Sequence, residues 1–327
     1  MPHALAFSLE FRSKNPDITK NARRIIMNPH TIDRRQFIKR LTGGAAVLTL
    51  GGLAGTTRAA TATDRVLLGK SGIEVSRLGI GTGTNGGRIQ REMGQPAFTR
   101  MIRHALDRGI TFFDTADNYK EMHEMLGKAL EGVDRESIQI QSKISPEKYD
   151  DPLQEIDRFR KELGTDYFDT FLIHCARNRN WHTQYARLRD QLQEAKEKQI
   201  IRSYGLSVHG MEPLEGILDS DWPELCLLRT NHNGHHMDGP SGKWREAGNR
   251  DLALQHIKTL HDQGKGIVGM KLVGNGDFTW IEERRKSVHF VMALDYVDAV
   301  VIGFKSPQEI DEMMGMMEEG LARRGGG

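Results

Sequence analysis

A regular alternation of strand-like and helical segments, starting near residue 65, constrains the fold of this chain most. Eight short runs are rich in β-branched or aromatic residues, and helical patterns fall between them. Such alternation predicts a parallel sheet with helices packed on it. Eight units over residues 65–322 match a (β/α)8 TIM barrel, which takes about 250 residues. We therefore expect one α/β domain over residues 63–327. The runs begin at Ser76, Thr111, Ser137, Asp169, Ile201, Glu224, Gly266 and Asp298, and the helical patterns span 97–107, 121–130, 153–163, 183–198, 212–218, 252–262, 280–290 and 307–321.

A doubly wound sheet is the competing fold. It would place a GxGxxG turn between its first strand and its first helix. The glycine-rich run here, residues 79–87 (GIGTGTNGG), leads into a polar loop instead. We therefore expect this run to form a tight turn at the barrel mouth. The preceding segment, residues 65–75, has the pattern of a small hairpin.

Residues 1–62 differ in composition from the rest of the chain. Arg34 and Arg35 precede a weakly apolar stretch from Leu41 to Ala54, and a small-residue segment, 60–62 (ATA), follows. This order resembles a twin-arginine export signal, so we expect export machinery as a partner and a periplasmic or exported protein. If the signal is not used, the location would be cytoplasmic, and a basic N-terminus without a targeting role is the alternative. The apolar stretch is shorter than the roughly 20 residues that span a bilayer, so we expect no stable membrane span after processing.

Charge and cysteine content exclude several classes of function. The formal net charge is +2, which gives no reason to expect nucleic acid as a partner. The two cysteines, Cys175 and Cys226, form no CxxC pair, so a metal site built on thiolates is not expected. Both lie in strand-like runs and are predicted to be buried core thiols.

Four polar residues follow or end three of the predicted strands: Asp114, Tyr119, Lys143 and His174. In a parallel barrel, polar groups at the carboxyl ends of successive strands converge on one mouth. An acid, a phenol, an amine and an imidazole gathered there can donate a proton to a substrate oxygen. That chemistry is the one carbonyl reduction requires.

The segments that carry these residues resemble the aldo-keto reductase family. The matching motifs are FFDTADNY, HEMLGKAL, QSKIS and FLIHCA, in that order along the chain. The resemblance implies that Tyr119 is the proton donor, that Lys143 paired with Asp114 tunes it, and that His174 orients the carbonyl. A free phenol has a pKa near 10. A nearby ammonium favours the phenolate, so Lys143 is expected to lower the pKa of Tyr119 toward the working pH.

The resemblance also implies a nicotinamide dinucleotide, because no side chain can supply a hydride. NADP is favoured on family grounds, with NAD as the alternative. Glu309 would repel a 2′-phosphate and accept a hydrogen bond from a 2′-hydroxyl. Lys305 has the opposite effect, because its positive charge favours the 2′-phosphate. Val208 and Arg229 depart from the residues common in the family. The residues implied in cofactor binding are Gly81, Thr82, Ser207, Arg229, Met270, Lys271, Leu272, Gly274, Gly303, Lys305, Ser306 and Glu309.

The sequence therefore predicts an NADPH-dependent reductase of a small-molecule aldehyde or ketone. A subunit that holds the cofactor for redox sensing or structure, with little turnover, is the alternative. His232, His235 and His236 cluster in the predicted loop after the sixth strand. No carboxylate–histidine spacing on a helix supports a metal site there, so we expect no bound metal and a solvated loop at the substrate mouth.

Overall fold

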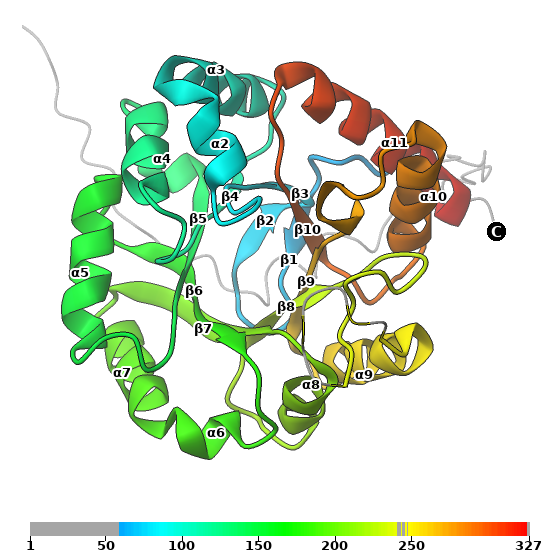
Figure 1. Ribbon diagram of the computed structural model, residues 1–327. Helices are drawn as coiled ribbons and strands as arrows, with labels where there is room; N and C mark the ends of the chain where they lie inside the picture. The colour runs from blue at the N-terminus through cyan, green and yellow to red at the C-terminus, as the bar shows by residue number, and fades with distance from the viewer. Residues whose placement is uncertain (1–58, 241–242, 244–245, 247, 326–327) are drawn as a thin grey trace, which may run out of the picture. The chain divides into compact units, whose positions relative to one another are not determined.

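Eight parallel strands close into a barrel (Figure 1), and this confirms the predicted fold. The computed structural model describes residues 59–240, 243, 246 and 248–325. From β3 to β10 each strand pairs with the next one in the chain, and β10 pairs with β3 to complete the ring. The strands are β3 (Leu78–Gly81), β4 (Phe112–Asp114), β5 (Gln139–Ile144), β6 (Phe168–Ala176), β7 (Ile201–Val208), β8 (Leu225–Arg229), β9 (Gly266–Met270) and β10 (Ala299–Ile302).

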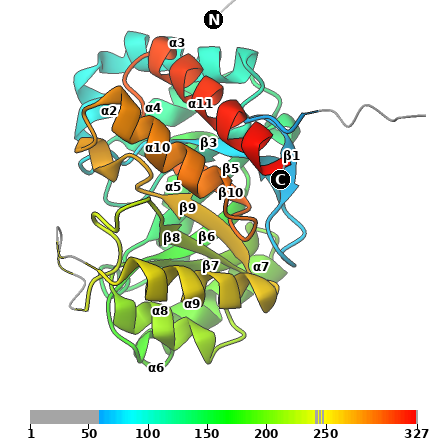
Figure 2. The same cartoon turned by 90° about the vertical axis from the view of Figure 1, so that its right-hand side faces the viewer.

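Helices form an outer ring around the strands (Figures 1 and 2). The predicted helix over 183–198 is divided at Tyr185, and α2 with two short 3-10 helices was not predicted. The helices are α2 (Arg88–Glu92), α3 (Gly94–Asp107), α4 (Met122–Leu130), α5 (Pro152–Leu163), α6 (Trp181–Gln184), α7 (Ala186–Glu197), α8 (Met211–Leu218), α9 (Arg250–Asp262), α10 (Ile281–Met292) and α11 (Pro307–Gly325), with the 3-10 helices η2 (Arg135–Ser137) and η3 (Gly274–Gly276).

Helix α5 shows how the sequence sets the ends of an element. The Asp151 carboxylate accepts hydrogen bonds from the backbone N–H groups of the first turn, and proline occupies the first helical position. Both features stabilise a helix N-terminus. Gly164 ends the helix in the left-handed conformation, with φ 68°, which glycine adopts without strain. The side chains that α5 buries against the barrel recur at helical spacing, namely Ile156, Phe159 and Leu163.

A β-hairpin closes the amino-terminal end of the barrel. Its strands, β1 (Arg65–Leu67) and β2 (Glu74–Ser76), pair antiparallel, as residues 65–75 predicted. Arg65 donates hydrogen bonds to Thr111 Oγ1 at 2.9 Å and to Gln139 Oε1 at 2.6 Å, at the beginnings of β4 and β5. The hairpin thus leaves the carboxyl-terminal end of the barrel open in the described part of the chain. The hairpin packs Leu68 and Val75 onto the apolar cluster of Phe112, Leu172, Leu225, Leu227, Val268, Met270, Ala299 and Val301.

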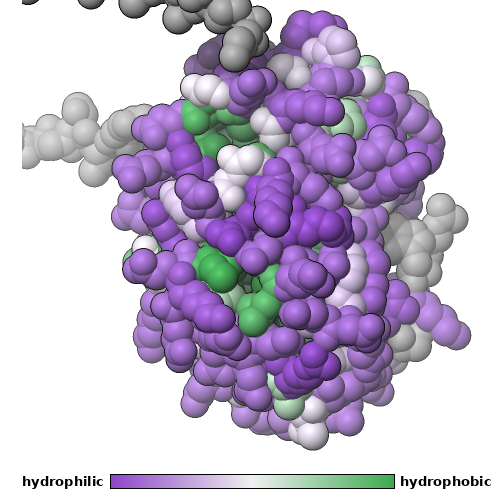
Figure 3. All heavy atoms as spheres, turned by 90° about the vertical axis from the view of Figure 1, so that its left-hand side faces the viewer, coloured by the Kyte–Doolittle hydropathy of each residue, from purple (hydrophilic) through white to green (hydrophobic). Residues whose placement is uncertain are grey.

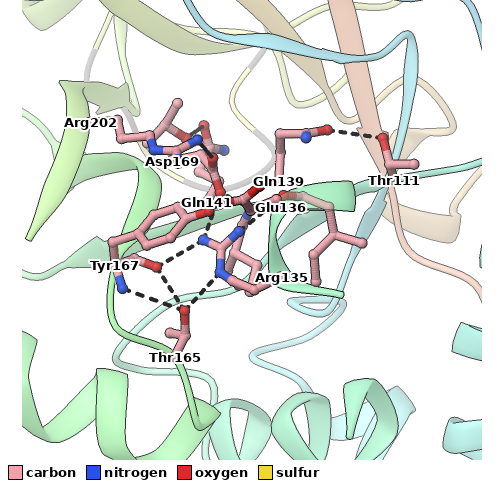
Figure 4. Close-up of polar contacts among 12 residues, drawn as sticks. Thr111, Arg135, Glu136, Gln139, Gln141, Thr165, Tyr167, Asp169 and Arg202 are labelled. Atoms are coloured by element: carbon pink, nitrogen blue, oxygen red, sulfur yellow. Dashed lines mark hydrogen bonds and ion pairs between the residues drawn. The ribbon is translucent and has the colours of Figure 1, made fainter. Parts of the chain in front are cut away.

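A polar network joins the beginnings of β5, β6 and β7 (Figure 4). The Asp169 carboxylate accepts hydrogen bonds from Arg135 at 2.7 Å and from Arg202 at 3.2 Å. Both guanidinium groups also lie against the Tyr167 ring, 3.8 Å and 4.0 Å from its centroid. Because the buried carboxylate is paired twice, its desolvation is offset. The network holds the closed end of the barrel and lies away from the open mouth.

The face of the barrel that carries α5 is largely hydrophilic, with small and separate apolar areas (Figure 3). Among the described residues, the large hydrophobic side chains that are exposed are Leu67, Trp280 and Ile281. No helix in the described part of the chain has the length and apolar character needed to cross a membrane.

The segment with the predicted export signal spans residues 1–62. Its part up to position 58 lies outside the described residues. At the boundary, Ala62 is fully buried against the barrel. Its carbonyl accepts a hydrogen bond of 2.8 Å from the N–H of Leu78 at the start of β3. This contact ties Ala62 to the start of β3.

Candidate active site

The structure brings together the four polar side chains that the sequence singled out. Asp114 is the last residue of β4, while Lys143 and His174 lie near the ends of β5 and β6. Tyr119 lies in the loop between β4 and α4. These strands are neighbours in the barrel, so their carboxyl ends share one part of the open rim.

Lys143 and Asp114 form a buried ion pair. Nζ of Lys143 lies 2.6 Å from Asp114 Oδ1, and the two side chains are 1% and 6% exposed. Nζ also donates a hydrogen bond of 2.7 Å to the carbonyl of Thr115. Gln141 donates to Asp114 Oδ1 at 2.7 Å and accepts from Thr170 Oγ1 at 3.0 Å. A buried pair is stable only when its remaining polar atoms are satisfied, and Gln141, which the sequence analysis missed, does this for the carboxylate.

The Tyr119 ring lies beside this ion pair, with Nζ of Lys143 5.1 Å from the ring centroid. Burial, together with the charges of Asp114, Cys175 and Asp117, raises the pKa of Tyr119 well above its usual value. The expectation that the Lys143 ammonium lowers this pKa was wrong. The main reason is burial, which disfavours the phenolate, and the charges of three acidic neighbours act in the same direction. The phenol therefore stays protonated in the free protein.

Gly83 makes room for the phenol and was not singled out in the sequence. A Cβ at this position would lie 2.2 Å from Cζ and 2.6 Å from the hydroxyl oxygen of Tyr119. Any side chain at Gly83 would therefore displace the ring. Residues 79–81 of the glycine-rich run belong to β3, and residues 84–87 form the predicted turn. The turn leads directly into the short helix α2, so the expected polar loop after it was wrong.

His174 is held by Asp117, another residue that the sequence analysis missed. Nδ1 of His174 lies 3.2 Å from Asp117 Oδ1, and the Asp117 carboxylate is fully buried. The same carboxylate accepts hydrogen bonds of 3.1 Å from the backbone N–H and the hydroxyl of Ser145. Although burial opposes ionisation, these bonds and the His174 imidazole hold the pKa of Asp117 well below its usual range. The His174 ring meets the Tyr119 ring edge to face, with centroids 5.6 Å apart.

The thiol of Cys175 differs from the buried core thiol that was predicted. Cys175 is partly exposed, and Sγ lies 3.4 Å from His209 Nε2. Its φ of 57° falls where the pairing of β6 with β7 shifts register. Such bulges change the direction of neighbouring side chains, and this one lies directly after His174. Cys226 is fully buried, as predicted.

A cavity of about 130 Å³ opens beside Tyr119 and Asp114. Five of the residues implied in cofactor binding line it, namely Gly81, Met270, Lys271, Leu272 and Gly303. Gly274 does not line the cavity itself. It belongs to η3, and the other two residues of η3 do line it. Burial, together with the charge of Arg229, lowers the pKa of Lys271 to about 8. The cavity thus joins the phenol to the loops after β3, β9 and β10.

Three of the implied cofactor residues are buried and do not line the cavity. Thr82 donates its hydroxyl to the Asp114 carbonyl at 3.0 Å. The Ser207 hydroxyl is buried, and no hydrogen-bond partner for it is found among the described residues. Arg229 is 1% exposed and lies 3.5 Å from Asp238. Burial raises the pKa of Asp238 to about 6 even with this partner.

The other three lie at the start of α11. The Lys305 N–H donates to the Glu309 carboxylate at 2.9 Å, and its Nζ lies 3.7 Å from the other oxygen. The hydroxyl of Ser306 accepts from the Glu309 N–H at 3.3 Å. Glu309 therefore bonds with residues at the start of its own helix. Lys305, Ser306 and Glu309 do not line the cavity.

A larger cavity, about 890 Å³, lies on the outer surface near α6, α7 and α8. Its walls include Arg179, Tyr204 and Trp222. None of the predicted site residues lines it. The chemistry-bearing groups are thus gathered at the barrel mouth rather than in this larger cavity.

Comparison with known proteins agrees with this geometry. "Probable aldo-keto reductase 1" of Glycine max is 29% identical over 230 residues, which is 65% of this chain and 60% of that protein. The chain thus spans less than two thirds of that relative's length. Among solved structures, a Pseudomonas aeruginosa protein named as an aldo-keto reductase, PA4992, matches with a TM-score of 0.64, 24% identity and coverage of 81% and 98%. An aldo-keto reductase from Klebsiella pneumoniae in complex with NADPH matches with a TM-score of 0.59, 15% identity and coverage of 80% and 93%.

These two structures share the fold with this chain. The family assignment comes from the sequence itself. The model of the aldo/keto reductase family matches residues 77–292, which include the whole cluster at the mouth. This chain therefore belongs to the aldo/keto reductase family.

Proposed function

We propose that this protein is an NADP(H)-dependent reductase of small aldehydes or ketones, with Tyr119 as the proton donor. The observation that carries the proposal is a phenol beside a cavity, next to the Asp114–Lys143 pair and to His174. A general acid needs a proton at working pH and a path to the substrate oxygen. Tyr119 meets the first condition because its pKa is raised, and it meets the second because it lines the cavity.

The residues around the cavity fit a dinucleotide. The buried hydroxyl of Ser207, for which the described residues offer no partner, suits a carboxamide. Gly303 lines the cavity next to Thr84, and a Cβ at Gly303 would lie 2.0 Å from Thr84 Oγ1. Lys271 lines the cavity, where its ammonium would favour a phosphate. NADP is supported further by the Klebsiella pneumoniae neighbour, which is a complex with NADPH.

Each residue of the cluster has a separate task in this proposal. When bound, the nicotinamide would supply the hydride. Tyr119 would donate its proton to the carbonyl oxygen, and the Lys143 ammonium, 5.1 Å from the ring, would favour the phenolate left behind. Asp114 holds Lys143 charged and in place. His174, held through Nδ1 by Asp117, would direct its other nitrogen to the carbonyl.

The direct test is loss of NADPH absorbance with a panel of aldehydes, comparing wild type with Tyr119→Phe. We expect kcat/KM to fall by at least about 100-fold, because general acid catalysis contributes roughly 10²–10⁴-fold. Tyr167→Phe is the matched control, since its hydroxyl is buried at the closed end of the barrel and no partner for it is found among the described residues. If NADPH binds but the wild type turns over no carbonyl, the alternative of a cofactor-holding subunit replaces the reductase.

Export by the twin-arginine route is a separate part of the proposal. It is supported by Arg34 and Arg35 before the apolar stretch 41–54 and by the small residues 60–62. Replacing both arginines by lysine keeps the charge while removing the paired guanidinium groups. We expect this variant to accumulate in the cytoplasm while the wild type appears in the periplasmic fraction. Equal distribution of the two would refute export by this route.

A further inference from the structure

Another group of ionisable side chains lies in two loops outside the catalytic cluster. His235 and His236 belong to the loop between β8 and α9, and Asp277 directly follows η3. Nε2 of His235 and Nε2 of His236 lie 2.9 Å and 2.8 Å from the same carboxylate oxygen, Oδ2 of Asp277. Ligand atoms of all three residues fall within 4.8 Å of one another.

The loop backbone is arranged to bring both imidazoles to one side. His236 has a φ of 54°, a left-handed conformation that is unfavourable for a bulky residue. As a result, the two adjacent rings lie with centroids 3.9 Å apart. Asn231 stabilises the turn, because it accepts from the Gly234 N–H at 2.8 Å and donates to the His235 carbonyl at 2.6 Å. Backbone strain of this kind is retained where the surrounding structure specifies it.

We propose that His235, His236 and Asp277 bind a divalent transition-metal ion of the Zn²⁺ type, with water in the remaining position. Two imidazoles and one carboxylate form a ligand set that suits Zn²⁺, Co²⁺ or Ni²⁺ better than Ca²⁺ or Mg²⁺. His236 is fully buried at its side chain, whereas His235 and Asp277 are 37% and 42% exposed. The exposed side leaves access for the ion and for the water.

The distances require only a small adjustment. Zinc–nitrogen bonds are about 2.05 Å, so ligand atoms in a tetrahedral site lie roughly 3.3 Å apart. The two Nε2–Oδ2 distances of 2.9 Å and 2.8 Å must therefore lengthen by about half an ångström. His235 and Asp277 are exposed enough to rotate.

Sequence spacing did not predict this site because the carboxylate comes from a distant loop, 41 positions from His236. The ion would join the β8–α9 loop to the segment that follows β9. Asn275 and Gly276, immediately before Asp277, line the cavity beside Tyr119. The ring of Phe278, the residue after Asp277, has its centroid 5.9 Å from the centroid of the His235 ring. A bound ion would thus fix one wall of the cavity.

The test is metal binding to the full chain without a polyhistidine tag, after removal of metal by a chelator and with no dinucleotide present. Zn²⁺ is titrated by calorimetry, and Co²⁺ by its visible absorption, which reports coordination by protein ligands. We expect one equivalent of tight binding in wild type and at least a tenfold loss of affinity in His235→Gln and in Asp277→Asn. The control is His104→Ala, because His104 also pairs with a carboxylate, Asp311 at 3.0 Å, but has no second imidazole in its cluster.

Thermal unfolding gives a second readout that does not depend on activity. Zn²⁺ should raise the Tm of wild type and of His104→Ala, and should leave the Tm of the other two variants unchanged. If either His235→Gln or Asp277→Asn fails to fold, the comparison of wild type with the other variant decides the test. Wild type that binds Zn²⁺ no more tightly than His235→Gln, or a control that loses binding equally, would overturn the proposal. Because no dinucleotide or carbonyl is used, this outcome is separate from that of the reductase assay.

Discussion

Nδ1 of His174 lies 3.2 Å from Oδ1 of Asp117, and this contact joins the end of β6 to the loop after β4. The carboxylate is fully buried and also accepts two hydrogen bonds from Ser145. Carboxylate–imidazole contacts of this kind fix the orientation and the tautomer of a histidine. Asp117 is therefore a positioning residue for His174.

Replacing Asp117 by asparagine should change the pH profile of the reaction. Interactions that include Asp117 raise the pKa of His174 against the opposing effect of burial, so the variant should lower this pKa. We expect kcat to fall about 10- to 100-fold, since misplacement by 1 Å can cost about 10²-fold, with KM for NADPH unchanged. Steady-state kinetics across pH measures both. Asp134→Asn, at the N-cap of η2, is the control, and an unchanged profile in Asp117→Asn would rule out the positioning role.

Breaking the buried ion pair should destabilise the protein. Lys143→Met leaves the Asp114 carboxylate without its cation in a site that is 6% exposed. We expect a loss of about 3–5 kcal/mol in the free energy of unfolding, measured by urea denaturation. The double variant with Asp114→Asn should recover part of this loss. Lys305→Met removes an exposed lysine paired with Glu309 at 3.7 Å and should change stability by less than about 1 kcal/mol.

Gly83→Ala should reduce activity more than stability. The new methyl group would overlap the Tyr119 ring, which must move out of the cavity. We expect a fall in kcat/KM of at least about 100-fold, comparable to loss of the general acid. Gly315→Ala, in the middle of α11 with no atom within 4 Å of the added Cβ, should keep full activity and gain up to about 1 kcal/mol of stability. A fully active Gly83→Ala enzyme would show that the phenol is not needed in this position.

Binding of the dinucleotide should weaken as the pH rises through about 8. Burial lowers the pKa of Lys271 to about 8, so its ammonium is present below that pH and is lost above it. Fluorescence titration of NADPH at several pH values measures the effect. Lys271→Arg keeps the charge at every pH and should flatten the dependence, whereas Lys271→Gln should bind weakly throughout. A pH dependence that persists in Lys271→Arg would assign it to another group.

The barrel was predictable because the evidence for it repeats eight times along the chain. Each strand-like run is followed by a helical pattern, so an error at one element, such as the division of 183–198 at Tyr185, leaves the topology unchanged. Three of the four clustered residues were predictable for a related reason. Parallel strands bring their carboxyl ends to one rim, so position along a strand is enough to place Asp114, Lys143 and His174 together.

The remaining parts of the site depend on contacts that spacing does not encode. Asp117 was overlooked because it lies in a loop, where nothing in the pattern shows which way a carboxylate points. The pKa of Tyr119 was predicted in the wrong direction, because the sum of burial and of three acidic neighbours exceeds the influence of one paired lysine. Similarly, Glu309 turned out to bond with Lys305 of its own helix turn.

The pairing of β10 with β3 has a consequence for how the molecule is made. Ile302 lies in register with Ile80, so the last strand to leave the ribosome completes a ring whose first strand emerged long before. Until then β3 and β9 present unpaired backbone groups, and such edges readily join those of other chains. Contacts between such distant positions also slow folding. Nascent chains that stall before β10 should therefore be prone to aggregation and dependent on chaperones.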